Sequence, residues 1–313
     1  MNKTYAVTGG AGFIGSNLVR GLLAAGAERV VVIDNYLTGN PANLEQVRDR
    51  IDLQVVDICD LPAMRKAVEG CDAVFHLAAI PSVPRSIDDP VPSHNVNING
   101  TFNVLTAAKE AGVRRVVYAA SSSAYGDTDV LPKVETMIPR PKSPYAAQKL
   151  LGEYYASVWS SCFGLEAVAL RFFNVYGPRQ DPTSAYSGVL SKFMTCVLQG
   201  TAPTIHGDGE QTRDFTYVED VVGLIRKASV APGVSGNVYN AGNGNRYSLN
   251  YVWEVLQKIA GVSLPPKYGP SRAGDVRDSQ ADTTAAVRDL GHDPQFDLEQ
   301  GLRRTLNWYR TQI

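Results

Sequence analysis

The sequence predicts an α/β protein: a doubly wound, parallel, Rossmann-like sheet joined to a smaller C-terminal α/β domain that faces the substrate. Short apolar runs alternate with helical patterns through the first half of the chain, and this alternation is typical of a parallel sheet covered by helices on both faces. The first run breaks into glycines spaced three apart, and the second run ends in an acid. Both features are typical of the start of a dinucleotide-binding fold.

Each expected element has its own apolar run or helical pattern. Strands are expected at residues 4–8, 29–33, 53–56, 73–76, 115–119 and 166–171, and helices near 13–25, 61–69, 93–112 and 144–163. For the last helix, Ser143 is a candidate N-cap, Pro144 suits the first turn and Gly164 suits the end. After Asn174, prolines interrupt the pattern. We therefore expect a dinucleotide-binding domain at residues 1–170, to which later segments return, and a mainly substrate-binding domain at residues 171–313.

Gly9, Gly12 and Gly15 lie where the first strand turns into the first helix. Glycines there allow a tight turn, close approach of the backbone to a pyrophosphate and close helix–strand packing, while the helix N-terminus favours an anion. Asp34 follows Gly15 by 19 residues, where an acid binds the adenosine ribose hydroxyls. No Arg or Lys stands at residues 35–38, which favours NAD over its 2′-phosphorylated relative. The weaker interpretation is a simple turn with a surface acid.

Composition narrows the class of partner. The 313 residues are 44% hydrophobic and 19% charged, with a net charge of −1, and this balance argues against nucleic acid or an anionic membrane. The first strand begins too early for a cleavable leader, and no apolar run reaches membrane-spanning length. Four scattered cysteines and four dispersed histidines lack ligand spacing, so we expect buried thiols, no metal and a cytoplasmic protein.

Tyr145 and Lys149 stand four residues apart, on one face of one expected helix. To act as a base near neutral pH, a tyrosine needs roughly 4 kcal/mol of preferential phenolate stabilisation. A lysine ammonium one turn away and a positive nicotinamide ring are expected to lower the pKa of Tyr145 by that amount. Ser121, Ser122 and Ser123 end the strand at 115–119, where α/β sites form. An ordinary solvated helix face is the alternative for the pair taken alone.

Several motifs together resemble the extended short-chain dehydrogenase/reductases over nearly the whole chain. They are Thr8-Gly-Gly-Ala-Gly-Phe-Ile-Gly15, Asp57-Ile58, His76-Leu-Ala-Ala79, Asn99-Gly-Thr101, the serine triplet with Tyr125-Gly126, and the Tyr145/Lys149 pair. Further motifs are similar to the nucleotide-sugar branch of this family: Arg171-Phe-Phe-Asn174-Val-Tyr-Gly-Pro178, Arg213-Asp-Phe215 and Arg272-Ala-Gly-Asp275.

The resemblance implies roles for individual residues of this chain. The implied NAD-binding residues are Gly9, Gly12, Phe13, Ile14, Gly15, Asp34, Asn35, Asp57, Ile58, Ala78, Ala79, Asn99, Tyr145 and Lys149. The implied UDP-sugar-binding residues are Ser82, Ser121, Ser122, Ser123, Asn174, Val189, Arg213, Arg272, Asp275 and Ser279. Arginine forks suit a diphosphate better than lysine does, whereas Arg85 and Arg179 are expected in surface ion pairs.

The resemblance also implies a reaction. Related sugar 4,6-dehydratases carry an Asp-Glu pair where this chain has Ser122 and Ser123, so 4-epimerisation through a transient 4-keto sugar is preferred over elimination. Similar epimerases that exclude N-acetylated sugars have a tyrosine at the position of Ser279, and glucose-preferring relatives have a lysine at Pro81. The segment Ser82-Val-Pro-Arg-Ser86, together with the triplet Ser121–Ser123, resembles bacterial UDP-N-acetylglucosamine 4-epimerases. UDP-GlcNAc/UDP-GalNAc is expected first, with UDP-glucuronate or UDP-glucose as runner-up.

Alternative classes remain at this point. A nucleotide-sensing or scaffold protein would have kept the fold and lost the chemistry, but the catalytic residues are all present here. A net NAD-dependent dehydrogenase or reductase acting on nucleotide sugars would need exchangeable cofactor. The helices near 93–112 and 144–163 are expected to pair across a two-fold axis, as in similar enzymes, which would make the protein a homodimer; burial within the monomer is the alternative.

Overall fold

A single parallel sheet organises the first lobe of the protein. The structure is a computed structural model that describes residues 3–181, 188–271 and 276–312. Seven parallel strands run in the order β11-β6-β5-β4-β1-β2-β3. Their bounds are β1 Thr4–Thr8, β2 Arg29–Ile33, β3 Asp52–Gln54, β4 Ala73–His76, β5 Arg115–Ser121, β6 Glu166–Phe172 and β11 Val238–Ala241. The predicted doubly wound parallel sheet is confirmed, and five of its strands begin at the predicted residue.

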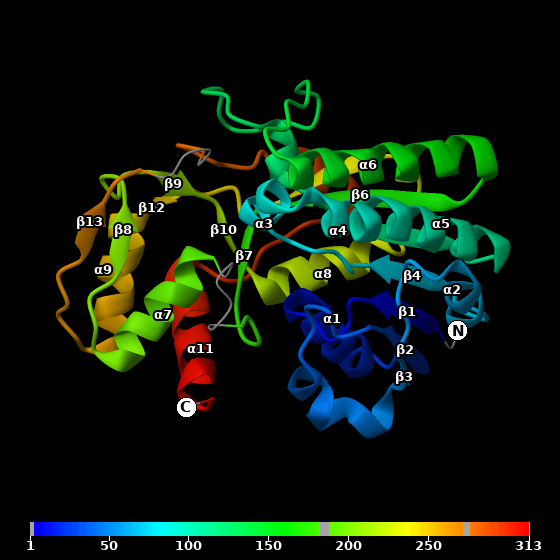
Figure 1. Ribbon diagram of the computed structural model, residues 1–313, viewed down its shortest axis with the longest axis horizontal. Helices are drawn as coiled ribbons and strands as arrows, with labels where there is room; N and C mark the ends of the chain where they lie inside the picture. Colours follow the sequence, from blue (N-terminus) through cyan, green and yellow to red (C-terminus); the bar gives the residue numbers. More distant parts are fainter. Residues whose placement is uncertain (1–2, 182–187, 272–275, 313) are drawn as a thin grey trace.

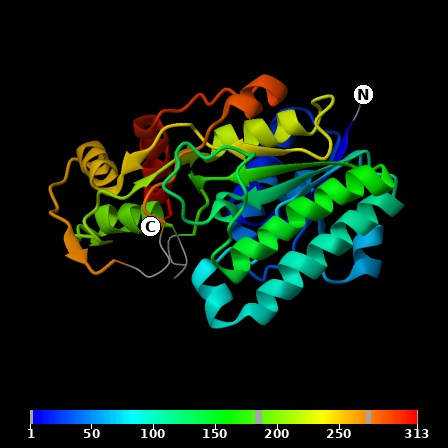
Figure 2. The same ribbon diagram turned by 90° about the horizontal axis from the view of Figure 1, so that it is seen from above.

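Successive residues of a strand point to opposite faces of the sheet. Both faces of this sheet are apolar, and helices cover both of them. Val7 belongs to the core under one face, and Ala6 to the core under the other. The first face packs against α1 (Phe13–Ala24), α8 (Val218–Ala228) and α10 (Thr284–Leu290). The second packs against α2 (Leu61–Ala67), α5 (Thr101–Glu110) and α6 (Pro144–Phe163). Figure 2 shows α5 and α6 side by side along this face.

The prediction of one regular α-helix at residues 93–112 is wrong, because a π-helical turn interrupts it. The run begins at α4 (Pro90–His94), passes through a π-helical turn at Asn95–Gly100 and continues as α5. A buried tertiary contact lies within this wider turn. The side chain of Asn97 accepts a hydrogen bond from the Ile80 nitrogen and donates one to the Ile80 carbonyl. A π-turn is a local feature that apolar periodicity does not register.

A second lobe lies beside the sheet and has its own core (Figure 1). It contains α7 (Val189–Gln199), α9 (Leu249–Ala260) and α11 (Leu298–Arg310) with three two-stranded pairings. The paired strands are β7 Asn174–Tyr176 with β10 Phe215–Tyr217, β8 Thr204–His206 with β13 Lys267–Gly269, and β9 Thr212–Arg213 with β12 Tyr247–Ser248. Because β11, α8 and α10 come from the later half of the chain, that half does return to the first sheet.

Short helices complete the connections: 3-10 segments at Pro41–Arg50 and Ser122–Tyr125, and α3 at Val83–Asp88. Among the described residues, no helix combines the length and apolar character needed to cross a membrane.

Candidate active site

The turn between β1 and α1 accepts only glycine at two of its three motif positions. Gly9 has a φ of +69°, and a Cβ there would lie 2.7 Å from the backbone nitrogen of Ala78. A Cβ on Gly15 would lie 2.1 Å from the Gly9 carbonyl oxygen. The strand, the turn and α1 are therefore packed backbone against backbone, and Gly12 is the residue that precedes the first helical turn. This cradle leaves the helix N-terminus open to an anion.

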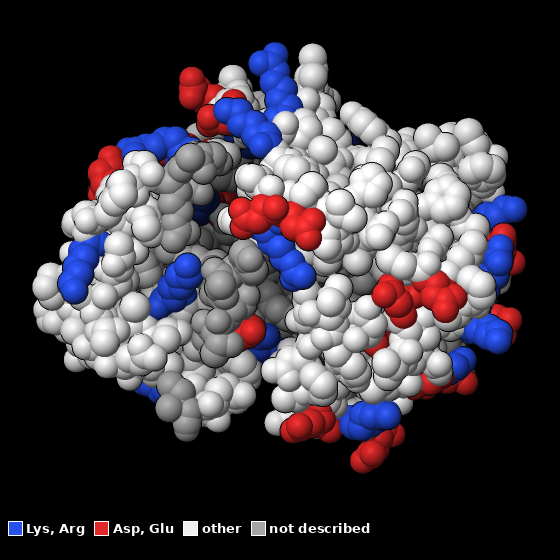
Figure 3. Space-filling model, in the orientation of Figure 1, with Lys and Arg blue, Asp and Glu red and all other residues white. Residues whose placement is uncertain are grey.

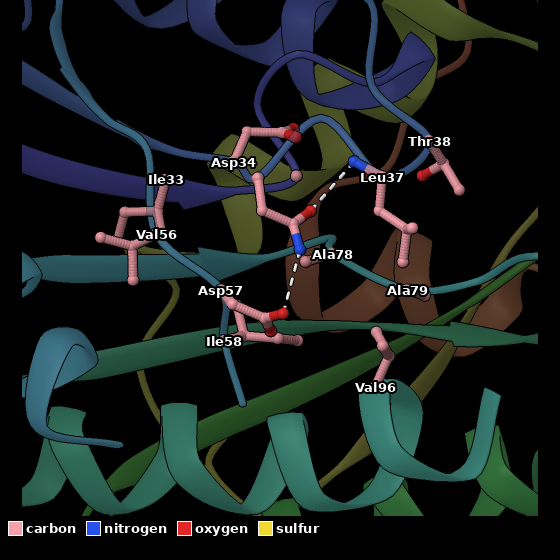
Figure 4. Close-up of a pocket in the computed structure, with 12 residues that line it drawn as sticks. Ile33, Asp34, Leu37, Thr38, Val56, Asp57, Ile58, Ala78, Ala79 and Val96 are labelled. Atoms are coloured by element: carbon pink, nitrogen blue, oxygen red, sulfur yellow. Dashed lines mark hydrogen bonds between the residues drawn. The ribbon is translucent and has the colours of Figure 1, made fainter. Parts of the chain in front are cut away.

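A groove continues from this turn along the edge of the sheet (Figure 4). Seven residues predicted to bind the cofactor line it together: Gly9, Asp34, Asn35, Asp57, Ile58, Ala78 and Ala79. Ile33, Leu37, Thr38, Val56 and Val96 complete the lining, and none of the lining residues is Lys or Arg. An apolar slot with two carboxylates and no cation suits an adenosine without a 2′-phosphate.

Asp34 is held in place at the mouth of this groove. Its carboxylate accepts hydrogen bonds from the backbone nitrogens of Ala11 at 2.9 Å and Tyr36 at 2.8 Å. Burial raises the pKa of Asp34, and these two donors oppose that rise. The side-chain amide of Asn35 donates to Asp57 at 3.1 Å. The residues of this end of the site therefore orient one another before any ligand binds.

The remaining predicted cofactor residues lie outside the groove lining. Phe13 and Ile14 open α1 and pack against the core of the second lobe. Asn99 is exposed, and its amide donates to Asn95 at 2.9 Å. Two residues earlier, Asn97 is buried and accepts from the Ile80 nitrogen at 2.8 Å. Sequence reasoning missed Asn97, although both asparagines stand in the same Asn-x-Asn pattern.

The predicted catalytic residues converge where β5 ends. The Ser121 hydroxyl lies 2.8 Å from that of Ser123, and the side chain of Ser121 is close enough to Tyr145 to lower its pKa. Ser122 begins the short 3-10 helix that follows the strand. Lys149 is 4% exposed, with its Nζ 4.5 Å from the centre of the Tyr118 ring. One strand end and one helix turn therefore bring a serine, a tyrosine and a buried lysine together.

The pKa values of the tyrosine and the lysine shift in opposite directions. Burial raises the pKa of Tyr145, while the hydrogen bond with Ser121 lowers it. Burial also lowers the pKa of Lys149 to about 7, because it disfavours the ammonium form. The expectation that Lys149 lowers the pKa of Tyr145 is not met by the chain's own groups. Desolvation is the largest influence on the pKa of each side chain.

His76 joins β1, β4 and the helical run without facing the site. Its ring nitrogens lie 2.8 Å from the Thr8 hydroxyl and 2.9 Å from the Thr101 hydroxyl. Burial lowers the pKa of His76 to about 3, so the ring stays neutral. It packs at the end of its strand, as expected.

Two of the predicted sugar-binding residues meet at β9. Arg213 donates from Nη1 to the carbonyls of Thr212 at 2.8 Å and Arg277 at 3.0 Å. The backbone nitrogen of Ser279 donates to the same Thr212 carbonyl at 3.2 Å. The segment that carries Ser279 therefore runs beside Arg213. Arg272 and Asp275, predicted on the same segment, lie outside the described residues.

The other predicted sugar-binding residues occupy element ends. Ser82 is buried and caps α3 by accepting from the Arg85 nitrogen at 3.1 Å. Asn174 begins β7, where its nitrogen donates to the Asp214 carbonyl at 3.0 Å, and Val189 begins α7.

Arg85 is partly buried, and among the described residues it forms no ion pair. Arg179 is not in a surface ion pair either, since it hydrogen-bonds Asn17 on α1 and burial lowers its pKa to about 10.

Asp214 is a structural contributor that sequence reasoning missed. Its fully buried carboxylate accepts from the backbone nitrogens of Asn243 at 2.8 Å, Gly244 at 2.9 Å and Ala281 at 3.1 Å. It thus ties the loop after β11 to the segment that carries Ser279. The sequence did contain a sign of its importance, because Asp214 directly follows Arg213 in the motif Arg213-Asp-Phe215.

Comparison with known proteins defines the class to which this fold and site belong. The model of the NAD dependent epimerase/dehydratase family matches residues 5–242, and the chain belongs to this family. The predicted family and cofactor are thereby confirmed: the protein is an NAD-dependent enzyme of the extended short-chain dehydrogenase/reductase type.

Three relatives illustrate the likeness. A UDP-glucose 4-epimerase from Mycolicibacterium smegmatis is 39% identical over 97% of both chains. The structure of a UDP-N-acetylglucosamine 4-epimerase from Methanobrevibacter ruminantium, in complex with UDP-N-acetylmuramic acid, shares 35% identity with a TM-score of 0.95, covering 100% of this chain and 99% of that one. A UDP-glucose 4-epimerase from Thermus thermophilus in complex with NAD shares 36% identity with a TM-score of 0.89, covering 99% and 100%.

Proposed function

We propose that this enzyme inverts the configuration at C4 of a UDP-sugar through a transient 4-keto sugar, with UDP-GlcNAc and UDP-GalNAc as its preferred pair. One observation carries the proposal: at the carboxyl end of β5, the side chain of Ser121 lies close enough to Tyr145 to lower its pKa, and the buried Lys149 follows Tyr145 by one helical turn. Parallel sheets build their sites at this carboxyl edge. Related proteins whose names state 4-epimerase activity support the same reaction.

Each catalytic side chain has a task in this reaction. Tyr145 accepts the proton of the sugar 4-hydroxyl and later returns it, while Ser121 hydrogen-bonds the same sugar oxygen as it changes between alcohol and ketone. The ammonium of Lys149 stabilises the phenolate of Tyr145. When bound, NAD supplies a hydride acceptor and donor and, in its oxidised form, a positive ring that favours the phenolate.

The cofactor residues are proposed on the cradle and the groove. The glycines of the β1–α1 turn, with the backbone of Phe13 and Ile14, would hold the pyrophosphate. The adenosine would be surrounded by Asp34, Asn35, Asp57 and Ile58. The rest of the cofactor site would be lined by Ala78, Ala79, Asn99 and Lys149.

The substrate residues are proposed on the second lobe and on the loops that meet it. Arg213, with Arg272 and Asp275, would bind the diphosphate and the uridine ribose, and Asn174, Val189 and Ser82 would complete the pocket. This assigns residues 1–170, with the returning segments, to NAD and residues 171–313 mainly to the UDP-sugar.

The proposed preference for N-acetylated sugars depends on the small side chain of Ser279, which would form one wall of the sugar pocket. Its segment is anchored to β9 through Thr212, so a larger side chain there would meet the sugar rather than swing away. Pro81 supports the same preference, since it replaces the lysine expected of glucose-preferring enzymes. Relatives named for UDP-glucose and for UDP-N-acetylglucosamine are about equally similar to this chain. UDP-glucuronate and UDP-glucose are therefore the second candidates.

We also propose a homodimer formed through α5 and α6. Lys149 and Glu153 are the only charged residues of α6 and both are buried, so its exposed face is uncharged. That face presents Tyr154, Val158 and Phe163 beside Phe102 of α5, and Figure 3 shows almost no charged side chains over it. Contiguous apolar surface of this kind marks an interface. All four cysteines are free, which supports a cytoplasmic location. The expectation that their thiols are buried is wrong for Cys59 and Cys162, which are exposed.

A turnover assay without added NAD tests the reaction. Purified protein is incubated with each UDP-sugar in turn, and the 4-epimers are resolved by NMR. We expect interconversion of UDP-GlcNAc and UDP-GalNAc with no net change in redox state.

Tyr145→Phe should lower the rate about 100- to 10,000-fold, since it removes the base, while co-purified NAD is unchanged. Tyr154→Phe, on the exposed face of the same helix, is the matched control. Normal turnover by Tyr145→Phe, or no turnover of any UDP-sugar by the wild-type enzyme, would contradict the proposal.

A further inference from the structure

A buried ion pair lies behind the catalytic residues and has no task in the mechanism above. Arg171 of β6 binds Glu153 of α6 with both ends of its fork, at 3.0 and 2.8 Å. The side chains are 4% and 2% exposed. Arg171 also lies over the ring of Tyr125, 4.5 Å from its centre, and the Tyr125 hydroxyl donates to Asn240 at 2.6 Å. A pair this buried is weak evidence for stability, because desolvation of two charges offsets their attraction.

The position of the pair on α6 indicates what it acts on. Tyr145, Lys149 and Glu153 follow one another at four-residue intervals, so they lie on one face of the helix, one turn apart. Lys149 is a buried cation that forms no ion pair with any of the described residues. Glu153 is the carboxylate one turn beyond it. Its charge raises the pKa of Lys149, against the burial that lowers it.

Other titratable groups surround Lys149 on the elements packed against α6. Tyr118 of β5 lies under the ammonium, His76 of β4 is neutral, and Tyr125 follows β5. Charged residues on the neighbouring helices are Arg85 and Asp88 of α3, His94 of α4, and Lys109 and Glu110 of α5. Of the described groups, Glu153 is the one whose charge shifts the pKa of Lys149.

Arg171 fixes where the Glu153 charge lies. Burial raises the pKa of Glu153, and the Arg171 fork and Lys149 both oppose that rise. A bidentate fork holds both carboxylate oxygens in one plane, so the negative charge cannot rotate away from the helix face that carries Lys149. The rigid pair thus presents a constant field to the lysine in a region of low dielectric.

We propose that Glu153, oriented by Arg171, is a positioning residue that keeps Lys149 in its charged form beneath Tyr145. The inference rests on the proposed function only for the task of Lys149. The arrangement solves a conflict in the site: the lysine must be buried to act strongly on Tyr145, yet burial removes its charge. A carboxylate one turn away, shielded from solvent and held by an arginine, favours the charged form of the lysine and opposes part of the effect of burial.

Titration of Lys149 by NMR tests the proposal. Protein labelled with ¹³C at lysine Cε is titrated, and the Lys149 signal is assigned from its loss in Lys149→Met. Glu153→Gln should lower the pKa of Lys149 by about one unit, a tenfold loss of proton affinity. The double variant Glu153→Gln/Arg171→Met, which replaces the pair by uncharged side chains of similar size, should lower the pKa of Lys149 in the same direction but by less, because Glu153→Gln alone also leaves the Arg171 cation unpaired. The alkaline limb of the rate profile should move to lower pH with it.

Two variants separate this effect from loss of packing. Glu153→Asp keeps the charge and should hold the pKa of Lys149 near its wild-type value even if the melting temperature falls. Glu166→Gln disrupts another glutamate–arginine contact of β6, with Arg114 and Arg115, and should leave Lys149 unchanged. A Lys149 titration that is identical in wild type, Glu153→Gln and the double variant would overturn the proposal. Because the titration needs no turnover, absence of epimerase activity would count against the proposed function alone.

Discussion

Lys149 shows how burial changes the chemistry of a single residue. Its pKa is lowered to about 7 in the folded protein, whereas a lysine in the unfolded chain has its ordinary pKa of 10.5. Between these values the unfolded chain binds more protons than the folded one, so the contribution of Lys149 to stability improves as the pH rises. At neutral pH the site therefore bears a stability cost for keeping a partly charged lysine out of water.

Replacing Lys149 by Met should remove that cost. The variant should be more stable than wild type at pH 7, and its advantage should shrink by about 3 kcal/mol between pH 7 and pH 10. Urea unfolding of both proteins at each pH, with the same NAD content, measures this difference. An advantage that is equal at both pH values would show that Lys149 titrates normally in the folded state.

Ser279 is the residue on which sugar preference depends in the proposed function. Ser279→Tyr should abolish turnover of UDP-GlcNAc and spare UDP-glucose, because the ring would occupy the space needed by the acetamido group. Relative kcat/KM for the two sugars is the measurement, and Ser279→Ala, which stays small, is the control. Equal loss on both sugars would remove Ser279 from the specificity argument.

At the scale of elements, α6 carries most of the proposed chemistry. Ser143 caps it by accepting from the Ala146 nitrogen, and Gly164 ends it with a left-handed φ of 68°. Gly152 lets the helix approach β5 closely, since a Cβ at this position would lie 2.2 Å from the Tyr118 hydroxyl oxygen. The same tyrosine lies under Lys149, so the packing distance of α6 and the geometry of the site are linked.

Gly152→Ala should therefore destabilise the protein despite alanine's higher helix propensity. Overpacking against the buried Tyr118 ring is expected to cost about 1–3 kcal/mol. Gly223→Ala in α8 is the matched control, because a Cβ there meets nothing within 4 Å, and it should stabilise by up to about 1 kcal/mol. Free energies of unfolding from chemical denaturation compare the two. A stabilised Gly152→Ala variant would mean that α6 can shift away from β5.

At the scale of the whole molecule, the exposed apolar side chains of α6 and of Phe102 at the start of α5 are the feature that the monomer leaves unexplained. Phe102, Tyr155, Trp159 and Phe163 contact one another in a continuous aromatic row, with Phe102 and Trp159 centroids 5.3 Å apart. Trp159 is buried at the base of this row, whereas Phe102 and Phe163 are exposed, and their exposed rings are suited to burial against a second copy of the chain.

Val158→Lys, in the middle of that face, should convert a dimer to a monomer. A buried, unpaired ammonium on each side of a two-fold interface is strongly unfavourable. Light scattering coupled to size exclusion measures the mass, and Val287→Lys on α10, a helical valine of similar exposure on the opposite face of the sheet, is the control. A wild-type protein that is monomeric at micromolar concentration would exclude this interface.

The sequence alone was sufficient for the features that depend on local spacing. The parallel sheet, the glycine turn, the bounds of α6 and the Tyr145/Lys149 pair follow from periodicity and from residues with unusual backbone preferences. Prediction was weaker where a distant contact decides the outcome. Asn97 and Asp214 were missed, because each holds a loop that is remote in sequence, and the helix at 93–112 was predicted without its π-turn for the same reason.

What the amino-acid sequence determined by itself is the class of fold, the family and the cofactor, since these depend on motifs whose spacing is set by strand and helix geometry. Only the tertiary structure decided the electrostatics of the site. Burial raises the pKa of Tyr145, lowers that of Lys149 and encloses the Glu153–Arg171 pair one turn away. Desolvation depends on every element packed around a group, and no local pattern of residues records it.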